Sequence, residues 1–238
     1  VLLKKTIFGI HIYAIGGKTD SAFWIPTIER YNPLTNAWES RADAPRPLAS
    51  FTAVPVNGII HIVGGGFSAP GTAGYYLGHL DYNPQTGTWL ESEISPIAGN
   101  EYFCDSSAAA VDQIIYYFGG LNSPVVSSVY TRLYDTFSQS WSYGTDIPVS
   151  CKDAAAASIG NRVFLFGGVY YVYGIFQRYN AISLYNPETN SWVSTFATMP
   201  TARYMHAAAA IGESIYIVGG ESADGVLAAD VIEFGLKR

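Results

Sequence analysis

Short apolar runs recur along the chain, and each of them ends at a pair of glycines. The runs occupy residues 12–15, 59–63, 114–118, 163–166 and 215–218, and the pairs that follow are Gly16-Gly17, Gly64-Gly65, Gly119-Gly120, Gly167-Gly168 and Gly219-Gly220. Short runs of β-branched and aromatic residues that stop at glycine predict buried β-strands. Successive pairs are 48, 55, 48 and 52 residues apart, so the chain is predicted to consist of five structural repeats.

A tyrosine and a tryptophan, always seven residues apart, follow each of the first four glycine pairs. They are Tyr31 and Trp38, Tyr82 and Trp89, Tyr134 and Trp141, and Tyr185 and Trp192. In three of the four cases the intervening segment contains Asn-Pro and then Thr-Asn or Thr-Gly, a sequence typical of tight turns. We therefore predict that the tyrosine ends one strand and the tryptophan begins the next, with both side chains filling the space between neighbouring repeats.

A third marker, a strand of small residues, precedes the later apolar runs at residues 53–54, 106–111, 154–159 and 207–211. Two-residue turn signals such as Asn57-Gly58 and Gly160-Asn161 join these strands to the runs. Each repeat is therefore predicted to have four antiparallel strands: a (small residues), b (ending at Gly-Gly), c (ending at tyrosine) and d (opening with tryptophan). The predicted repeats span about residues 1–43, 44–95, 96–147, 148–198 and 199–238.

Two histidines lie near strand b of the second repeat. His61 aligns with Tyr13, Tyr116, Phe164 and Tyr216 of the other repeats, so it is interpreted as a substitution in the core. His79 is placed in the b–c loop of the same repeat. No spacing of His and Cys typical of a zinc site appears, and we expect neither a metal nor a cofactor.

The succession of apolar strand, Gly-Gly, Tyr and Trp resembles the kelch repeat, and the resemblance covers essentially the whole chain in five copies, four of them with the Trp. It implies an all-β, kelch-type β-propeller of five four-stranded blades, the last of which lacks its outer strand in this chain. Residues 1–8 take the place of strand a in the first blade. Two alternatives stay open: a five-bladed ring closed by this atypical strand, or a segment of a larger protein, such as a six-bladed ring.

The composition narrows the class of protein further. The chain has 238 residues, a net charge of −6, 13% charged residues and 15% aromatic residues. So many apolar side chains exclude a disordered chain, and an acidic balance argues against nucleic acid as a partner. No apolar run is long enough for a membrane helix, so we expect no membrane insertion, and a soluble, cytoplasmic location is favoured. Cys104 and Cys151 are expected to be free thiols.

The loops of such a repeat divide between two faces. The a–b and c–d turns are short and regular, whereas the b–c and d–a loops vary in length and share the other face. Variable loops on a regular scaffold are where binding residues concentrate, and the kelch resemblance implies the same face. We take as candidate binding residues the aromatic and charged side chains of these loops: Trp24, Arg46, Tyr75, Tyr76, Glu101, Tyr102, Lys152, Tyr171, Arg178, Arg203, Tyr204 and His206.

These residues favour a non-catalytic recognition module that binds a protein or peptide on the face with the b–c and d–a loops. The alternative is a carbohydrate-binding or sugar-isomerising propeller, similar to the sialic-acid mutarotases of kelch type, with a pocket at the channel mouth. Convergence of Arg46, Glu101, Arg203 and His206 in one pocket would favour the sugar. No catalytic residue is assigned, and enzymatic activity is left open with a non-catalytic role favoured. The same residues also have a purely structural interpretation. The charged side chains would be solvated at the rim of the channel, and the aromatic rings would fold back over their own blade.

Overall fold

The computed structural model describes residues 4–8, 11–18, 24–69, 72–75, 78–93, 104–123, 126–222 and 225–235. These residues form strands and connecting turns, with no helix among them. None of the described segments is therefore a helix that could cross a membrane. The chain divides into two compact units, residues 1–104 and residues 105–238, which we take in turn.

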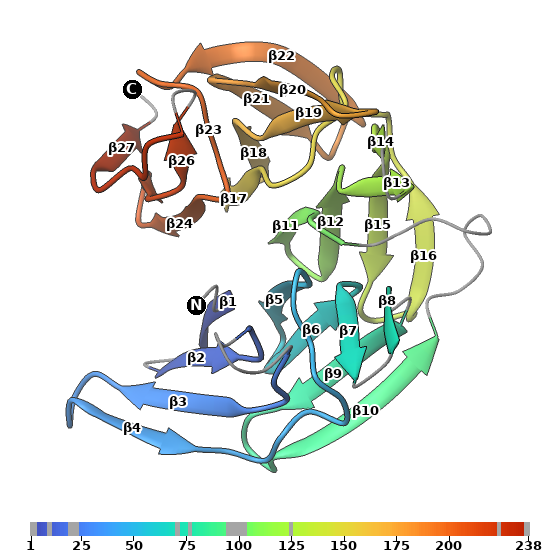
Figure 1. The fold of residues 1–238 in the computed structure, drawn as a ribbon, viewed down its shortest axis with the longest axis vertical. Helices are drawn as coiled ribbons and strands as arrows, with labels where there is room; N and C mark the ends of the chain where they lie inside the picture. The colour runs from blue at the N-terminus through green and yellow to red at the C-terminus, as the bar shows by residue number, and fades with distance from the viewer. Residues whose placement is uncertain are drawn as a thin grey trace. The chain divides into compact units, whose positions relative to one another are not determined.

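The first unit contains two antiparallel sheets of four strands each (Figure 1). One consists of β1 (Lys4–Phe8), β2 (His11–Ile15), β3 (Ile28–Asn32) and β4 (Ala37–Ser40). The other consists of β5 (Thr52–Val56), β6 (Ile59–Val63), β9 (Gly78–Asn83) and β10 (Thr88–Glu93), with the hairpin of β7 (Gly66–Ala69) and β8 (Thr72–Tyr75) inserted between β6 and β9. These are the predicted strands a to d in order. The interpretation of His79 as a loop residue was wrong, because β9 begins at Gly78.

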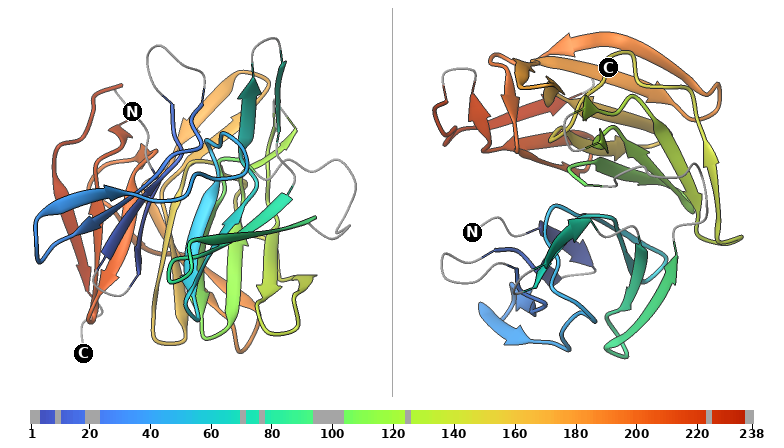
Figure 2. Two further views of the ribbon diagram at one scale, coloured as in Figure 1. Left: turned by 90° about the horizontal axis from the view of Figure 1, so that it is seen from below. Right: turned by 45° about the vertical axis from the view of Figure 1, so that its right-hand side comes forward.

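The second unit repeats the same arrangement, as the two further views in Figure 2 also show. Its first sheet consists of β11 (Ser107–Val111), β12 (Ile114–Phe118), β15 (Thr131–Asp135) and β16 (Ser140–Tyr143). The next consists of β17 (Ala155–Ile159), β18 (Arg162–Phe166), β21 (Ala181–Asn186) and β22 (Ser191–Thr198). The last has three described strands, β24 (Ala207–Ile211), β25 (Ser214–Val218) and β27 (Val231–Gly235). Strand c of the fifth repeat thus ends at Phe234 and Gly235, in agreement with the sequence.

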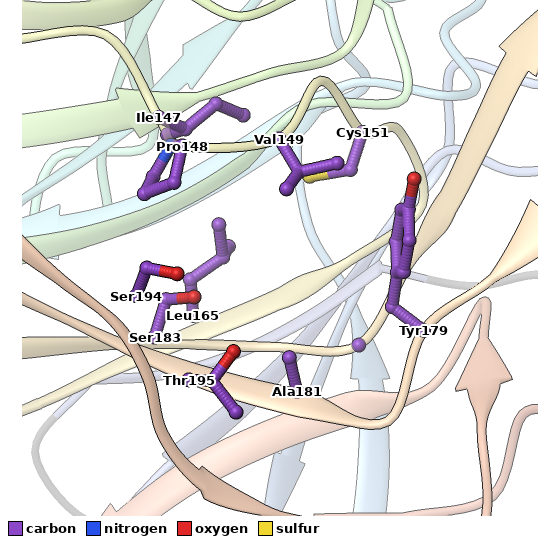
Figure 3. A pocket seen from close by; sticks show the side chains of 11 residues that line it. Ile147, Pro148, Val149, Cys151, Leu165, Tyr179, Ala181, Ser183, Ser194 and Thr195 are labelled. Carbon is purple, nitrogen blue, oxygen red and sulfur yellow. The ribbon is translucent and has the colours of Figure 1, made fainter.

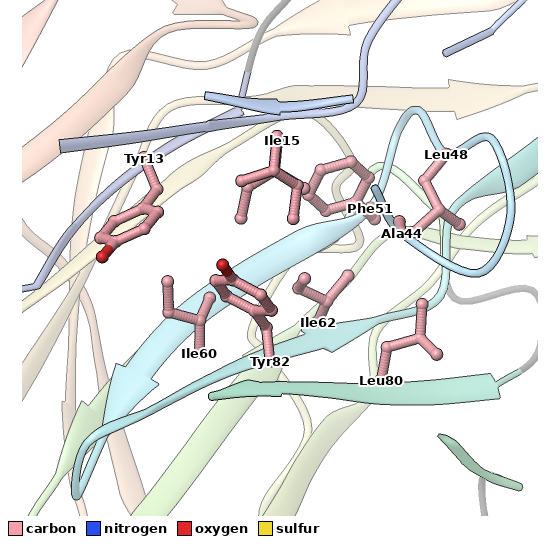
Figure 4. Close-up of a cluster of buried hydrophobic side chains, with 10 residues drawn as sticks. Tyr13, Ile15, Ala44, Leu48, Phe51, Ile60, Ile62, Leu80 and Tyr82 are labelled. Atoms are coloured by element: carbon pink, nitrogen blue, oxygen red, sulfur yellow. The ribbon is translucent and has the colours of Figure 1, made fainter. Parts of the chain in front are cut away.

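The core of the first unit lies between its two sheets (Figure 4). Tyr13 and Ile15 on β2 face Ile60 and Tyr82 of the second sheet, and the rings of Tyr13 and Tyr82 meet edge to face with centroids 6.2 Å apart. Strand alternation places these side chains on one face of each sheet. Each sheet therefore depends on its neighbour to bury that face, as expected for stacked repeats.

In the second unit a tryptophan joins two repeats. The Trp192 ring lies 5.2 Å from Phe118 of the preceding repeat and 5.0 Å from Tyr185 of its own, measured between centroids. Its Nε1–H donates to the carbonyl of Thr145 at 2.9 Å. This contact confirms the predicted role of the Tyr–Trp pair for the fourth repeat. Trp38 of the first repeat differs: it is 48% exposed, and its ring lies against that of Tyr31 in the same repeat.

The glycine pairs hold the next repeat in place through the backbone. The N–H of the second glycine donates to a carbonyl of the following d–a loop: Gly17 to Leu48 at 2.8 Å, Gly120 to Cys151 at 2.9 Å and Gly168 to Arg203 at 2.9 Å. A Cβ on the first glycine of each of these pairs would overlap the same carbonyl oxygen, and φ is positive there. Glycine is thus required for the close approach of the two backbones. We call this contact the glycine clamp.

Replacing Gly119 by alanine tests the clamp. Gly119→Ala should lower the free energy of unfolding by about 2–5 kcal/mol, because it adds an overlap with the Cys151 carbonyl to the cost of a left-handed residue. Gly160→Ala is the matched control, since its φ of +53° is similar but nothing lies within 4 Å of the added carbon. It should cost only about 1–2 kcal/mol. Equal losses in chemical denaturation of the two variants would show that the clamp contributes nothing.

Replacing the tryptophans tests the contact between repeats. Trp192→Ala should lower the free energy of unfolding by about 3–5 kcal/mol, because it leaves a cavity beside Phe118 and Tyr185. Trp38→Ala should cost less than about 2 kcal/mol, since half of that side chain already lies in water. Denaturant titration of both variants measures the difference, and a loss below 1 kcal/mol for Trp192→Ala, on the order of a surface substitution, would refute its role.

Candidate functional site

The b–c loops of the third and fourth repeats form a sheet of their own. Its strands are β13 (Leu121–Ser123), β14 (Val126–Ser127), β19 (Val169–Val172) and β20 (Ile175–Arg178), in that order. Val126 on β14 pairs with Val172 on β19, so hydrogen-bonded strands join the loops of two repeats. The hydroxyl of Ser127 also accepts the Tyr171 N–H at 3.2 Å. These loops are therefore ordered strands that can present side chains in fixed positions.

The hairpin of β19 and β20 exposes large apolar side chains. Tyr173 at its turn is 78% exposed, Ile175 65% and Phe176 50%, and the ring of Tyr171 lies 4.6 Å from that of Phe176. Tyr173 and Gly174 have φ values of +46° and +86°, as in a two-residue type I′ turn. A bulky residue with positive φ is strained, and such strain is often retained where a side chain has a binding role. We call Tyr171, Tyr173, Ile175, Phe176 and Arg178 the hairpin surface.

The base of the hairpin contacts both the d–a loop and the b–c loop of the fifth repeat. Arg178 donates from Nη2 to Glu221 at 3.3 Å, and its guanidinium lies 5.2 Å from the centre of the Tyr204 ring. Tyr204, on β23 (Arg203–Tyr204), pairs directly with Glu221 on β26 (Glu221–Ser222). Of the predicted binding residues, Tyr171 and Arg178 thus lie on this hairpin, and Tyr204 contacts Arg178 at its base.

Arg203 and His206 lie inside the scaffold. The buried guanidinium of Arg203 donates to both carboxylate oxygens of Asp230 at 3.1 and 3.0 Å, and to the carbonyl of Gly219 at 3.2 Å. His206 is buried next to it, and burial, reinforced by the Arg203 charge, lowers the pKa of His206 to about 4. At neutral pH the imidazole is therefore uncharged. Since the donors of Arg203 hold its own chain together, we leave Arg203 and His206 out of the hairpin surface.

Lys152 is also held by its own chain. Its Nζ pairs with Asp153 and lies 3.3 Å from Asp105, and its backbone forms an isolated bridge with Val169. Burial acts to lower the pKa of Lys152, but the charges of Asp153 and Asp105 raise it above its usual value. The amine is therefore protonated, and its positive charge is balanced by the two carboxylates. These ion pairs hold the d–a loop in place. Cys151 beside it is a free, buried thiol, and burial raises its pKa to about 12, so it stays protonated.

The candidates in the first unit are less completely described. The ring of Trp24 packs against the backbone of Gly66 on β7, so it is folded over a neighbouring loop and only partly exposed. Arg46 forms an ion pair with Glu91. Tyr75 lies on β8, but its side chain is outside the described residues, as are Tyr76, Glu101 and Tyr102. Because Glu101 is outside the described residues, convergence of Arg46, Glu101, Arg203 and His206, the feature that would favour a sugar, stays a hypothesis.

A small cavity opens between the third and fourth repeats (Figure 3). Its volume is about 50 Å³, and it is lined by aliphatic groups, among them Val149 and Leu165, and by the hydroxyls of Ser194 and Thr195. It lies beside an irregularity in the pairing of β21 with β22, between Ile182 and Leu184. Pockets for small ligands usually have volumes of about 300–1,000 Å³, so this one is too small for a sugar.

The hairpin surface includes residues that were not among the sequence-based candidates. Tyr173, Ile175 and Phe176 belong to it and are more exposed than any candidate that the structure describes. The signal that could have found them is the Tyr-Gly pair at residues 173–174, flanked by two four-residue runs rich in β-branched and aromatic residues. Such a pattern is typical of a hairpin with a two-residue turn.

Comparison with known proteins agrees with this architecture. The family model of the KLHDC2/KLHL20/DRC7 kelch-repeats domain matches residues 105–238, and the kelch motif matches residues 7–45. Kelch-like protein terF of Aspergillus terreus is 27% identical over 229 residues, which cover 90% of this chain and 48% of that protein. Kelch-like protein 35 of Mus musculus is 25% identical over 66% of this chain and 25% of its own length. The chain thus spans about half or less of these relatives.

Among solved structures, YjhT superposes with a TM-score of 0.83 over 99% of this chain and 81% of its own, at 16% identity. At 16% sequence identity, this structural similarity shows a shared fold and nothing about function. Members of the kelch-repeat family are typically protein-interaction modules. The repeats, the four-stranded sheets and the matched family model together show that the chain belongs to the kelch-repeat family and has the fold of a kelch-type β-propeller.

Proposed function

We propose that this domain is a non-catalytic recognition module that binds a protein or peptide through the hairpin surface. The observation that carries the proposal is that Tyr173, Ile175 and Phe176 are all exposed on one ordered hairpin, with Ile175 and Phe176 on opposite faces of β20. Leaving such side chains in water forgoes the free energy of burying them, so three of them within four residues of one hairpin support a binding role for it. Aromatic residues with a neighbouring arginine are also the types that dominate the energetics of protein interfaces.

The edge of the hairpin offers a second element of recognition. Strand β20 stands last in the order β13-β14-β19-β20, so its outer edge has no strand partner among the described residues. An extended peptide can add to such an edge through backbone hydrogen bonds while its side chains contact the apolar residues beside it. The hairpin surface is therefore suited to a peptide that contains apolar residues and binds as an extended strand.

The described residues favour a protein or peptide over a sugar. Recognition of a monosaccharide needs a concave pocket with several polar groups that are free to contact it. In the second unit Arg203 already binds Asp230, Lys152 already binds two carboxylates, and the cavity in Figure 3 is too small. A carbohydrate-binding or sugar-isomerising activity is kept as the second outcome of the experiment below.

Selection of peptides from a displayed library against the purified domain tests the proposal. Peptides that bind should lose affinity by about 10-fold or more when Ile175 and Phe176 are both changed to serine, because the apolar contact is removed. Tyr173→Ser should weaken binding in the same direction. Fluorescence anisotropy measures the dissociation constants, and denaturant titration confirms that each variant is folded.

Phe137→Ser is the matched control, because Phe137 is 89% exposed but lies in the c–d turn of the third repeat. It should leave peptide affinity unchanged. Peptides that bind all variants equally would show that the hairpin surface is not the binding site. A domain that selects no peptide but binds members of a glycan array, or accelerates sialic-acid mutarotation, would overturn the proposal in favour of the sugar.

A further inference from the structure

Three side chains that can ligate a metal converge on the second sheet of the first unit. His61 lies on β6, and His79 and Asp81 lie on the neighbouring strand β9. The Nδ1 atom of His61 is 2.6 Å from Asp81 Oδ1, the Nε2 atom of His79 is 2.8 Å from the same oxygen, and the two nitrogens are 3.3 Å apart. We call these residues the His–His–Asp trio.

Strand register accounts for this convergence. His61 is the direct cross-strand partner of Asp81, and His79 is two residues from Asp81 on the same strand. All three side chains therefore lie on one face of the sheet, since alternate residues of a strand point the same way. This is the face opposite to Ile60, Ile62, Leu80 and Tyr82, which form the core with the first sheet. The trio depends only on the pairing of two adjacent strands.

The repeat scaffold does not require these residue types. The position of His61 is three residues before the glycine pair, and that of Asp81 is one residue before the strand c tyrosine, or before Phe234 in the fifth repeat. The residues at these two positions are cross-strand partners in all five sheets. The other repeats have Tyr13, Ile28 and Arg30; Tyr116, Thr131 and Leu133; Phe164, Ile182 and Leu184; and Tyr216, Val231 and Glu233. The second repeat alone among the five has two histidines and a carboxylate at these positions. The pair of histidines is thus particular to the second repeat, and strand pairing brings it together with a carboxylate.

The trio also has the charge and burial that a cation site needs. Both imidazoles are buried, while the Asp81 side chain is 18% exposed and gives the group contact with solvent. The carboxylate oxygen lies within 2.8 Å of a nitrogen of each imidazole, and carboxyl groups are ionised at neutral pH. An ionised carboxylate and imidazole nitrogens are the forms in which these side chains bind a metal.

The distances are close to those of a tetrahedral site. With bonds of about 2.0–2.1 Å to zinc, two ligand atoms of a tetrahedron lie about 3.3 Å apart. The two nitrogens already have this separation, and the carboxylate oxygen must withdraw by about 0.5–0.7 Å, which a small rotation of the Asp81 side chain allows. Two histidines and one carboxylate are a ligand set that zinc accepts, with a fourth position open to water or another ligand.

We propose that His61, His79 and Asp81 form a binding site for a divalent transition-metal ion of the Zn²⁺ class. The bound ion would tie β6 to β9 through side chains, in addition to their backbone hydrogen bonds. The competing interpretation is a cluster in which both imidazoles donate protons to Asp81 Oδ1 and no metal binds. The two interpretations use the same atoms, so a metal titration distinguishes them.

Calorimetric titration of untagged, chelator-treated protein with Zn²⁺ tests the site. We expect one ion per chain with micromolar or tighter affinity, a rise in the melting temperature, and the visible absorption of tetrahedral Co²⁺ when cobalt replaces zinc. His61→Phe and Asp81→Asn should each weaken zinc binding by at least about 100-fold and abolish the cobalt spectrum, because loss of a ligand costs more than loss of an outer-shell contact.

The variants keep the experiment interpretable. Phenylalanine stands at the equivalent position 164, so His61→Phe suits the scaffold, and Asp81→Asn preserves the shape of the side chain. His206→Asn is the matched control, since His206 is buried but lies outside the trio, and it should leave the stoichiometry and the affinity unchanged. Undiminished zinc binding by His61→Phe and Asp81→Asn, or no stoichiometric binding by the wild-type protein, would overturn the proposal.

Discussion

The hydrogen bond from a glycine N–H to a carbonyl of the following repeat is the contact on which the rest of each unit depends. It occurs from Gly17 to Leu48, from Gly120 to Cys151 and from Gly168 to Arg203. The acceptor is a backbone carbonyl, so this hydrogen bond does not restrict which side chain the acceptor residue carries. This explains how leucine, cysteine and arginine can occupy one structural position, whereas the first residue of each of these glycine pairs leaves no space for a Cβ.

The glycine clamp also determines which loops are available for binding. It draws the d–a loop against the scaffold, so the side chains of Cys151, Lys152 and Arg203 are buried or neutralised there. The hairpin of β19 and β20 projects from the same region, and only its base, through Arg178, is tied to a neighbouring loop. Its turn and outer residues remain exposed. Among the described residues of these loops, the hairpin surface thus combines ordered strands with exposed side chains at Tyr173, Ile175 and Phe176.

The His–His–Asp trio illustrates a different property of a repeated sheet. Pairing between strands is made by the backbone, so one repeat can change the side chains on one face without altering the register. Tyr116 and Leu133 are paired in the third repeat just as His61 and Asp81 are paired in the second. A position that packs as an aromatic ring in one blade can therefore take a polar role in another, provided that its polar atoms find partners.

The sequence alone determined the repeats, their strand order and the family, because these markers act locally and recur: the glycine pairs five times, the Tyr–Trp spacing four times and the Asn-Pro turn three times. It also located strand c of the fifth repeat at Phe234. It misplaced His79, because a strand that begins at glycine after a variable loop has no clear local signal. It grouped Arg203 and His206 with surface residues, because composition does not reveal burial.

Only the tertiary structure decided which candidate side chains are exposed, which are held in hydrogen bonds and ion pairs within the chain, and which lie close together. The pairing of β14 with β19 joins loops of two different repeats, and the pairing of β6 with β9 brings His61 next to Asp81 across 20 residues of chain. Both results follow from hydrogen bonds between strands that are distant in sequence. The physical reason is that local chemistry sets where strands begin and end, whereas exposure and proximity depend on how separate strands pair and pack.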